Sequence, residues 1–378
     1  MSWFRCCRSR EEFRLNSRRQ VRASLVIILA VVGLLILVFT VGKLFDTGIE
    51  NNSNPGGDPL VIVWELVGSE IDYDLIGDLG PVQVVAPTWF HLSDGLGNVR
   101  SDFDPLYRQW AGERGYQVWA LVTNSFDPDL TADLLVNKRH RNQFAQNLVD
   151  LAVENKLDGL NIDFENFHYD FRDHFTSFIT ELAQLCYAEN LVLSVDVTMP
   201  SNSEYWSRGY DRTALAAVAD YIILMAYDEH WASSPVAGSV ASLPWVEAGL
   251  QQLLNEVPPE KLILGIPFYT RLWVIDETVA IPKVVNSWSY SMMRVAEIVA
   301  ENEALITFDD QAGQHLAVYE KEGLIYKMWL EDSVSMRRRL ELVKKYNLAG
   351  LAGWRRGLET PEIWELMENF FDCNGSCE

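Results

Sequence analysis

The sequence predicts an α/β protein built as a TIM barrel of eight strands and helices. Strand-like and helix-like runs alternate through most of the chain, and the strand-like runs number eight. A doubly wound open sheet is the alternative fold, but the chain has no G-x-G-x-x-G or Walker sequence that would give such a sheet its nucleotide site. The expected strands are residues 60–64, 82–86, 117–122, 157–165, 191–198, 221–227, 261–268 and 348–354.

The region before the first strand is predicted to be a membrane anchor and a linker. Residues 1–22 form a basic stub with seven arginines, and residues 23–42 (ASLVIILAVVGLLILVFTVG) carry no charge. About twenty apolar residues are enough to span a membrane as a helix. Because the arginines precede this run, we expect a single-pass protein of the cell membrane, with a cytoplasmic N-terminus and an extracytoplasmic catalytic domain.

A cleaved signal and a buried core helix are the alternatives for the apolar run, and its sequence favours neither. A cleaved secretory signal usually has a shorter apolar core, and no A-x-A pattern follows residue 42. A buried core helix would carry a polar stripe, which the run lacks. Residues 43–58 are predicted to be a linker, of which the segment 46–58 is polar and rich in Asn and Gly. Its thirteen residues reach at most about 45 Å, so the body would work close to the membrane.

The catalytic body is expected over residues 59–372. Two stretches between strands have a clear helical period, one marked by Phe144 and Leu148 and the other by Phe175 and Phe178. The basic run MRRRLELVKK at 336–345 is predicted to be a solvated helix face.

An insertion is predicted between the seventh and eighth strands. These strands are separated by roughly eighty residues, whereas most of the others start about 20–40 residues apart, as expected for βα units. The extra segment, about 272–330, mixes the strand-like pieces ALITF, HLAVYE and LIYKMWL with one helical stretch, MMRVAEIVAEN. We expect a small α+β insertion beside the active-site cleft, with a structural ornament as the alternative.

The net charge bears on which partners the protein can bind, and the cysteines bear on its core and its tail. The net charge of −22 makes nucleic acid an unlikely partner, since proteins that bind it carry basic patches. Cys186 lies in an apolar helical pattern and is expected in the core. Cys373 and Cys377 lie in the tail, residues 373–378, where they could form a small disulfide outside the cell.

The segment Leu157–Asn166 (LDGLNIDFEN) carries the strongest functional signal. Side chains alternate along a strand, so Asn161, Asp163 and Glu165 share one face while apolar residues occupy the other. Three polar groups on a covered face are costly unless they do chemistry. Two carboxylates this close raise one pKa, and a raised pKa provides a general acid at neutral pH.

Glycoside hydrolysis needs such an acid to protonate the leaving oxygen. A metal site is the alternative use of paired acids, but the histidines show no H-E-x-x-H spacing, so neither a metal nor a cofactor is expected. A half-exposed surface strand is the remaining alternative for this segment.

Three separated motifs resemble glycoside hydrolase family 18, the chitinase-like TIM barrels. Residues 158–165 are similar to the D-x-x-D-x-D-x-E signature, and Met225-Ala226-Tyr227-Asp228 resembles the sixth-strand M-x-Y-D motif. Trp354 resembles the tryptophan that floors the sugar subsite, and residues 264–269 resemble the seventh strand. VVAPTWF, LSVDVT and KMWLED look most like the bacterial subgroup of spore-cortex and peptidoglycan N-acetylglucosaminidases.

The resemblance implies a retaining, substrate-assisted mechanism. Glu165 would be the acid, and Asp163 and Tyr227 would hold the sugar's 2-acetamido group while it attacks its own anomeric carbon. The resemblance also implies a partner, an N-acetylglucosamine-containing polysaccharide. Further substrate contacts are expected from Asn161, Met225, Asp228, Trp354, Tyr269, Arg271, Trp89 and Trp329, with core packing as the alternative for Trp89 and Trp329.

One position departs from the signature, because Asn161 stands where the family has Asp. Asn cannot hold a negative charge, although it could still hydrogen-bond Asp163. The favoured substrate is peptidoglycan or spore cortex, and chitin or chitooligosaccharide is the alternative. A second alternative is a non-catalytic glycan-binding or scaffold protein of the same fold. Asp158 falls on the other strand face and is expected to be structural.

Overall fold

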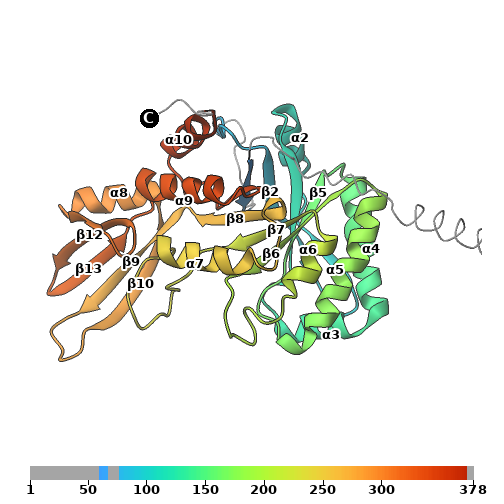
Figure 1. The fold of residues 1–378 in the computed structure, drawn as a ribbon, viewed down its shortest axis with the longest axis horizontal. Helices are drawn as coiled ribbons and strands as arrows, with labels where there is room; N and C mark the ends of the chain where they lie inside the picture. Colours follow the sequence, from blue (N-terminus) through green and yellow to red (C-terminus); the bar gives the residue numbers. More distant parts are fainter. Residues whose placement is uncertain (1–58, 67–75, 373–378) are drawn as a thin grey trace, which may run out of the picture. The chain divides into compact units, whose positions relative to one another are not determined.

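The computed structural model describes residues 59–66 and 76–372, and all of them belong to one compact unit, Ser53–Glu378 (Figure 1). The basic stub, the apolar run 23–42, the linker 43–58 and both C-terminal cysteines lie outside the described residues. Among the helices of the described ranges, none has the length and apolar character needed to cross a membrane. The anchor therefore stays a prediction.

Eight parallel strands close into the predicted barrel. Their order is β1-β14-β8-β7-β6-β5-β4-β2, and β1 also pairs with β2, which closes the ring. Each of the eight expected strands is present. Their bounds are β1 Leu60–Glu65, β2 Val84–Leu92, β4 Gln117–Thr123, β5 Gly159–Asp163, β6 Val192–Thr198, β7 Tyr221–Met225, β8 Leu262–Pro267 and β14 Gly350–Trp354. A short strand, β3 Val99–Ser101, pairs with β2 in the antiparallel sense.

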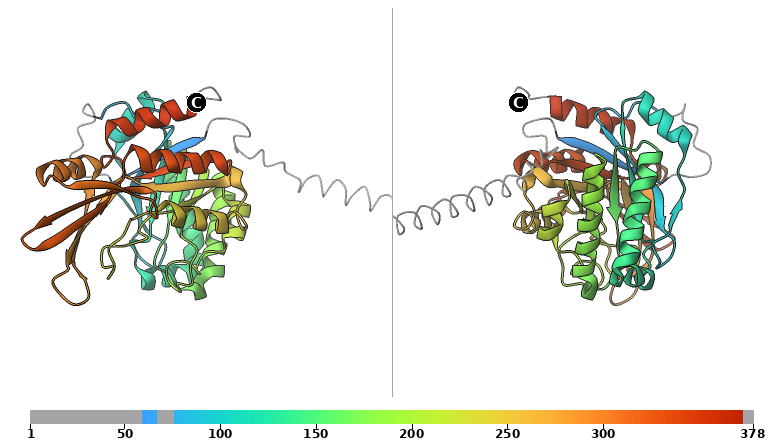
Figure 2. Two further views of the ribbon diagram at one scale, coloured as in Figure 1. Left: turned by 60° about the vertical axis from the view of Figure 1, so that its left-hand side comes forward. Right: turned by 90° about the vertical axis from the view of Figure 1, so that its right-hand side faces the viewer.

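The helices that follow the strands form an outer layer. They are α2 Pro105–Glu113, α3 Pro128–Val136, α4 Lys138–Glu154, α5 Arg172–Ala188, α6 Arg212–Val218, α7 Leu243–Leu253, α9 Ser333–Lys345 and α10 Pro361–Asp372, with 3₁₀ turns at Tyr169–Phe171 and Pro259–Lys261. Asp104 and Asp127 each cap a helix that begins with proline, and Asp332 forms a capping box at α9. The two helices predicted from their apolar period are α4 and α5, which lie side by side in Figure 2.

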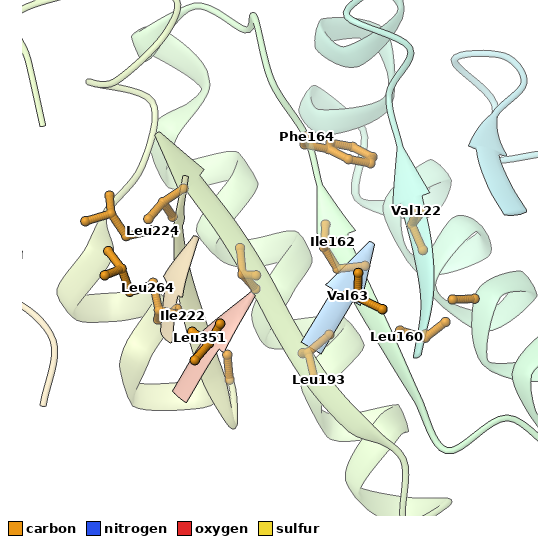
Figure 3. Packing of buried hydrophobic residues seen from close by; sticks show 14 of the residues in the cluster. Val63, Val122, Leu160, Ile162, Phe164, Leu193, Ile222, Leu224, Leu264 and Leu351 are labelled. Atoms are coloured by element: carbon orange, nitrogen blue, oxygen red, sulfur yellow. The ribbon is translucent and has the colours of Figure 1, made fainter. Parts of the chain in front are cut away.

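Two separate sets of buried side chains explain the alternation along the strands. Leu160, Ile162 and Phe164 belong to the large core between the strands and the helices, where Figure 3 shows them beside Val122 and Leu193. The smaller core fills the barrel interior and includes Ile62, Trp64, Val84, Trp119, Tyr221, Ile223 and Ile263. Cys186 is 1% exposed, so its predicted place in the core is confirmed. The polar face of β5 therefore looks into the barrel.

The insertion between β8 and β14 is a five-stranded sheet with one helix. Its strand order is β10-β9-β13-β12-β11, and neighbouring strands in it run antiparallel. The bounds are β9 Tyr269–Asp276, β10 Lys283–Ser291, α8 Met292–Glu301, β11 Leu305–Asp309, β12 Gln314–Lys321 and β13 Leu324–Trp329. The expected α+β insertion is confirmed, and it also contains the hairpin of β9 and β10, which the sequence pattern did not separate.

The basic helix α9 corrects one expectation. The run 336–345 was predicted to face solvent, but Met336, Arg339 and Leu340 are at most 2% exposed. Arg339 is buried because it forms an ion pair with the equally buried Glu331. A charged residue within a basic run can therefore belong to the interior when a partner from another element meets it.

Candidate active site

Glu165 lies just beyond the end of β5, at the carboxyl end of the barrel strands. Its backbone is held on both sides by the buried Asn124, whose Oδ1 accepts from the Glu165 N–H at 3.1 Å and whose Nδ2 donates to the Glu165 carbonyl at 2.6 Å. This clamp fixes where the carboxyl group can point. The sequence analysis did not identify Asn124, although it directly follows strand β4, at the barrel end that carries TIM-barrel sites.

Asp163 and Glu165 form the carboxyl pair that the sequence predicts. Burial raises the pKa of Asp163 to about 7. Burial also raises the pKa of Glu165 well above its ordinary value, and the negative charges of Asp163 and Asp228 add to this shift. One oxygen of Asp163, Oδ1, is buried and has no hydrogen-bond partner among the described residues. With its pKa raised in this way, Glu165 keeps its proton near neutral pH, as a general acid must.

An aromatic group borders the acids. The rings of Tyr227 and Trp354 stack with centroids 6.5 Å apart, and the edge of Trp64 meets both rings. The pKa of the Tyr227 hydroxyl is raised, first by burial and then by the charges of Asp163, Asp196 and Glu165, so this tyrosine lies within the field of the acids. Such flat apolar faces suit the C–H faces of a sugar ring.

Asp228 connects the site to the insertion. It has a positive φ of 59°, and its Oδ1 accepts from the Tyr269 hydroxyl at 2.5 Å and lies 3.4 Å from Nη2 of Arg271. Tyr269 is the first residue of β9 and Arg271 the third, so the insertion borders the site. Three of the predicted contacts, Asp228, Tyr269 and Arg271, are thus brought together. Met225 is 7% exposed at the end of β7.

Trp89 and Trp329, the two aromatic contacts with core packing as the alternative, differ in their surroundings. Trp89 is 0% exposed and packs against Phe103 and Tyr107, so its predicted role as a substrate contact is wrong and the core-packing alternative holds. Trp329 ends β13 in the insertion, where its Nε1 donates to Asp309 at 2.8 Å. Asp158 accepts from the Val118 N–H at 2.8 Å, which gives it the expected structural role.

The side chain of Asn161 hydrogen-bonds groups other than Asp163, the partner that the sequence suggests. Its Nδ2 donates to Asp196 Oδ1 at 2.7 Å and to Ser194 Oγ at 3.0 Å, so both amide hydrogens are already used. Its Oδ1 accepts from Nε1 of Trp64 at 2.8 Å. Trp64 and Asp196 were both missed. Trp64 lies in an apolar strand run, and LSVDVT, which contains Asp196, contributed to the family resemblance without giving Asp196 a role.

Comparison with known proteins identifies the family that this geometry belongs to. The model of glycosyl hydrolases family 18 matches residues 127–359, which include the acid pair, Tyr227, Trp354 and the barrel strands from β5 to β14. The chain belongs to glycosyl hydrolase family 18. It is a glycosidase, as the sequence analysis predicted.

Relatives of this family 18 glycosidase include proteins of Bacillus subtilis. The glycosylase YdhD of Bacillus subtilis (strain 168) is 28% identical over 312 residues, which cover 80% of this chain and 72% of that protein. The cortical fragment-lytic enzyme of the same organism is 24% identical over 67% of this chain and 58% of the enzyme. The spore cortex-lytic enzyme SleL of Bacillus megaterium QM B1551 shares the fold, with a TM-score of 0.72 and 20% identity over 84% of this chain and 75% of SleL.

Proposed function

We propose that this glycosidase cleaves β-linked N-acetylglucosamine-containing glycan of peptidoglycan or spore cortex, with retention of configuration. The observation that carries the proposal is the pair Asp163 and Glu165, two carboxyls with raised pKa at the carboxyl end of the strands, beside Tyr227. Cortical fragment-lytic enzymes among the relatives favour this glycan class. Chitin or chitooligosaccharide is the second candidate, favoured by the similarity to di-N-acetylchitobiases and to solved chitinases.

The chemistry proposed for the site is substrate-assisted. Glu165 gives its proton to the glycosidic oxygen, while the carbonyl oxygen of the 2-acetamido group attacks the anomeric carbon of the same sugar. The bond to the leaving sugar breaks as a cyclic, positively charged intermediate forms. Asp163, once ionised, lies beside that charge, and Tyr227 holds the acetamido group. Glu165, now without its proton, takes one from water, and the resulting hydroxide opens the ring from the same face that the leaving group occupied.

Product analysis tests the substrate and the stereochemistry together. Purified peptidoglycan and chitooligosaccharide are incubated separately with the full-length protein, and the products are examined by mass spectrometry and by proton NMR during the first minutes. We expect new reducing ends of N-acetylglucosamine on the peptidoglycan glycan, released first as the β-anomer. Release from chitooligosaccharide alone would favour the second candidate. An α-anomer as the first product would contradict the retaining mechanism.

We also propose that residues 23–42 anchor the protein in the cell membrane, with the catalytic body outside. The charge-free apolar run behind seven arginines supports this. We expect the full-length protein to stay with the membranes after alkaline carbonate washing, and a variant lacking residues 1–42 to be released. A mature protein whose N-terminus begins after residue 42 would show that the run is a cleaved signal instead.

A further inference from the structure

Asp196 lies beside Asp163 on the next strand of the barrel. The register pairs Asn161 with Ser194 and Ile162 with Val195, so one step further along brings Asp163 level with Asp196. Neighbouring strands are about 4.8 Å apart. Because Asp196 also bonds the inward-facing Asn161, both carboxyl groups point into the barrel.

Asn161 holds Asp196 in place and leaves Asp163 without a donor. The amide hydrogens of Asn161 go to Asp196 and Ser194, and its oxygen is taken by Trp64. Asp196 is 1% exposed, and Oδ1 of Asp163 is buried with no partner among the described residues. A buried carboxylate oxygen needs a donor, and the acid on the neighbouring strand β6 can supply one when it carries a proton.

We propose that Asp163 and Asp196 form a carboxyl pair that shares one proton, in which the Asp196 hydroxyl donates to the Asp163 carboxylate and holds it in its working position. The inference rests on the proposed function for the role of Asp163, and it makes Asp196 a positioning residue for the same reaction. Two carboxylates at this spacing in a poorly hydrated interior cannot both be charged at low cost, so one proton stays with the pair.

Other titratable groups surround the pair, and their negative charges favour the protonated form of Asp196. Burial is the largest cause of the raised pKa of Asp196, followed by the charge of Asp163, whereas the bond from Asn161 opposes the shift. Glu165 faces the pair from the loop after β5, Tyr227 from the end of β7, and Tyr210 from the segment before α6. The negative charges in this group disfavour a second ionisation and favour the retained proton.

Two substitutions at Asp196 distinguish the effect of its hydrogen bond to Asp163 from the effect of the shared proton. In Asp196→Asn the amide can still donate to Asp163 but has no proton to share, and in Asp196→Ala the donor is lost. The full-length proteins are labelled with ¹³C at the aspartate side-chain carboxyl carbons and titrated by NMR. Asp220→Asn is the matched control, because Asp220 has a burial-raised pKa at the start of β7, away from the pair.

In the unsubstituted protein we expect the signals of Asp163 and Asp196 to titrate in two coupled steps, the second well above the ordinary carboxyl range. In Asp196→Asn, Asp163 should titrate in a single step. In Asp196→Ala that step should move to higher pH, because no donor stabilises the charged carboxylate. The control should leave both steps in place. Titration of Asp163 in one unchanged step in all four proteins would overturn the pair.

Kinetics on the glycan substrate then test the positioning role. We expect Asp196→Ala to lower kcat by about 10- to 100-fold with little change in KM, the range for loss of a hydrogen bond to a charged group, and Asp196→Asn to recover most of it. Equal kcat in Asp196→Ala and the unsubstituted protein would overturn that role. If the unsubstituted protein cleaves none of the glycans, the proposed function fails, and the NMR titration still decides whether the proton is shared.

Discussion

Glu165→Gln should lose nearly all turnover on N-acetylglucosaminyl glycans, with kcat falling by about 10³-fold or more. A positioned general acid contributes about 10²–10⁴-fold, and in this reaction the same carboxyl also activates the water. Gln has nearly the same shape and keeps the backbone contacts with Asn124, so the fold should survive. The measurement is release of reducing ends at saturating substrate, with the unfolding temperature recorded for both proteins.

Glu247→Gln is the matched control for this substitution. Glu247 bonds Lys345 and Tyr346 between α7 and α9, away from the acid pair, so its loss should leave kcat unchanged. The pH profile gives a second check. Because the pKa of Glu165 is raised, its proton is held through neutral pH, and activity should decline only as pH rises above the ordinary carboxyl range. Normal turnover in Glu165→Gln would remove Glu165 from its assigned role.

The barrel could be predicted from the sequence because each strand carries its own signal. The apolar runs, their number and the alternation on β5 are local patterns, and the burial of Leu160 and Ile162 against the helices follows from period two alone. The acid pair was predictable for the same reason, since Asp163 and Glu165 are neighbours on one strand face. The aromatic and acidic residues of the M-x-Y-D motif were predictable only through the family resemblance.

The parts that could not be predicted depend on contacts between distant segments. Asp196 lies in LSVDVT, a strand pattern that does not show which residue its carboxyl group contacts. That contact is Asn161, 35 positions earlier in the chain. Trp64 is linked to Asn161 across 97 positions. Trp89 is an aromatic residue of the kind that contacts sugars, but it is buried in the core. Its burial depends on packing between distant segments, which the sequence pattern does not show.

The buried ion pair of Glu331 and Arg339 is another contact of this kind. It joins α9 to the insertion and to the loop after β7. Nη2 of Arg339 donates to the Ala241 carbonyl at 2.7 Å and to Glu331 at 2.9 Å, and Nη1 donates to the other Glu331 oxygen. The same carboxylate accepts from Gln314 and Ser335, each at 2.9 Å. Both charged side chains are almost fully buried, so neither can turn to water.

Arg339→Met should destabilise the protein by about 3–5 kcal/mol, the cost of leaving one member of a buried pair unpaired. Burial already raises the pKa of Glu331, and Arg339 works against that shift. Without the arginine, the folded-state pKa of Glu331 rises further above its unfolded value. Stability is then lost as pH rises from the unfolded pKa toward the folded one, so the defect should be smaller at pH 5 than at pH 8. Urea unfolding at both pH values measures it.

The double variant Glu331→Gln with Arg339→Met separates the unpaired charge from the lost packing. It removes both charges and keeps the bonds from Gln314 and Ser335, so it should recover most of the stability and lose the pH dependence. Arg294→Met is the control for removing an arginine from an exposed cluster. Arg294 pairs with Glu297 and Glu301 at the surface, so its loss should change the free energy of unfolding little.

Arg339→Met alone should also lower activity. Tyr269 and Arg271, near the start of β9, hold Asp228, so activity should fall in proportion to the loosening of the insertion. A single variant as stable as the unsubstituted protein at pH 8 would show that the pair does not secure the insertion.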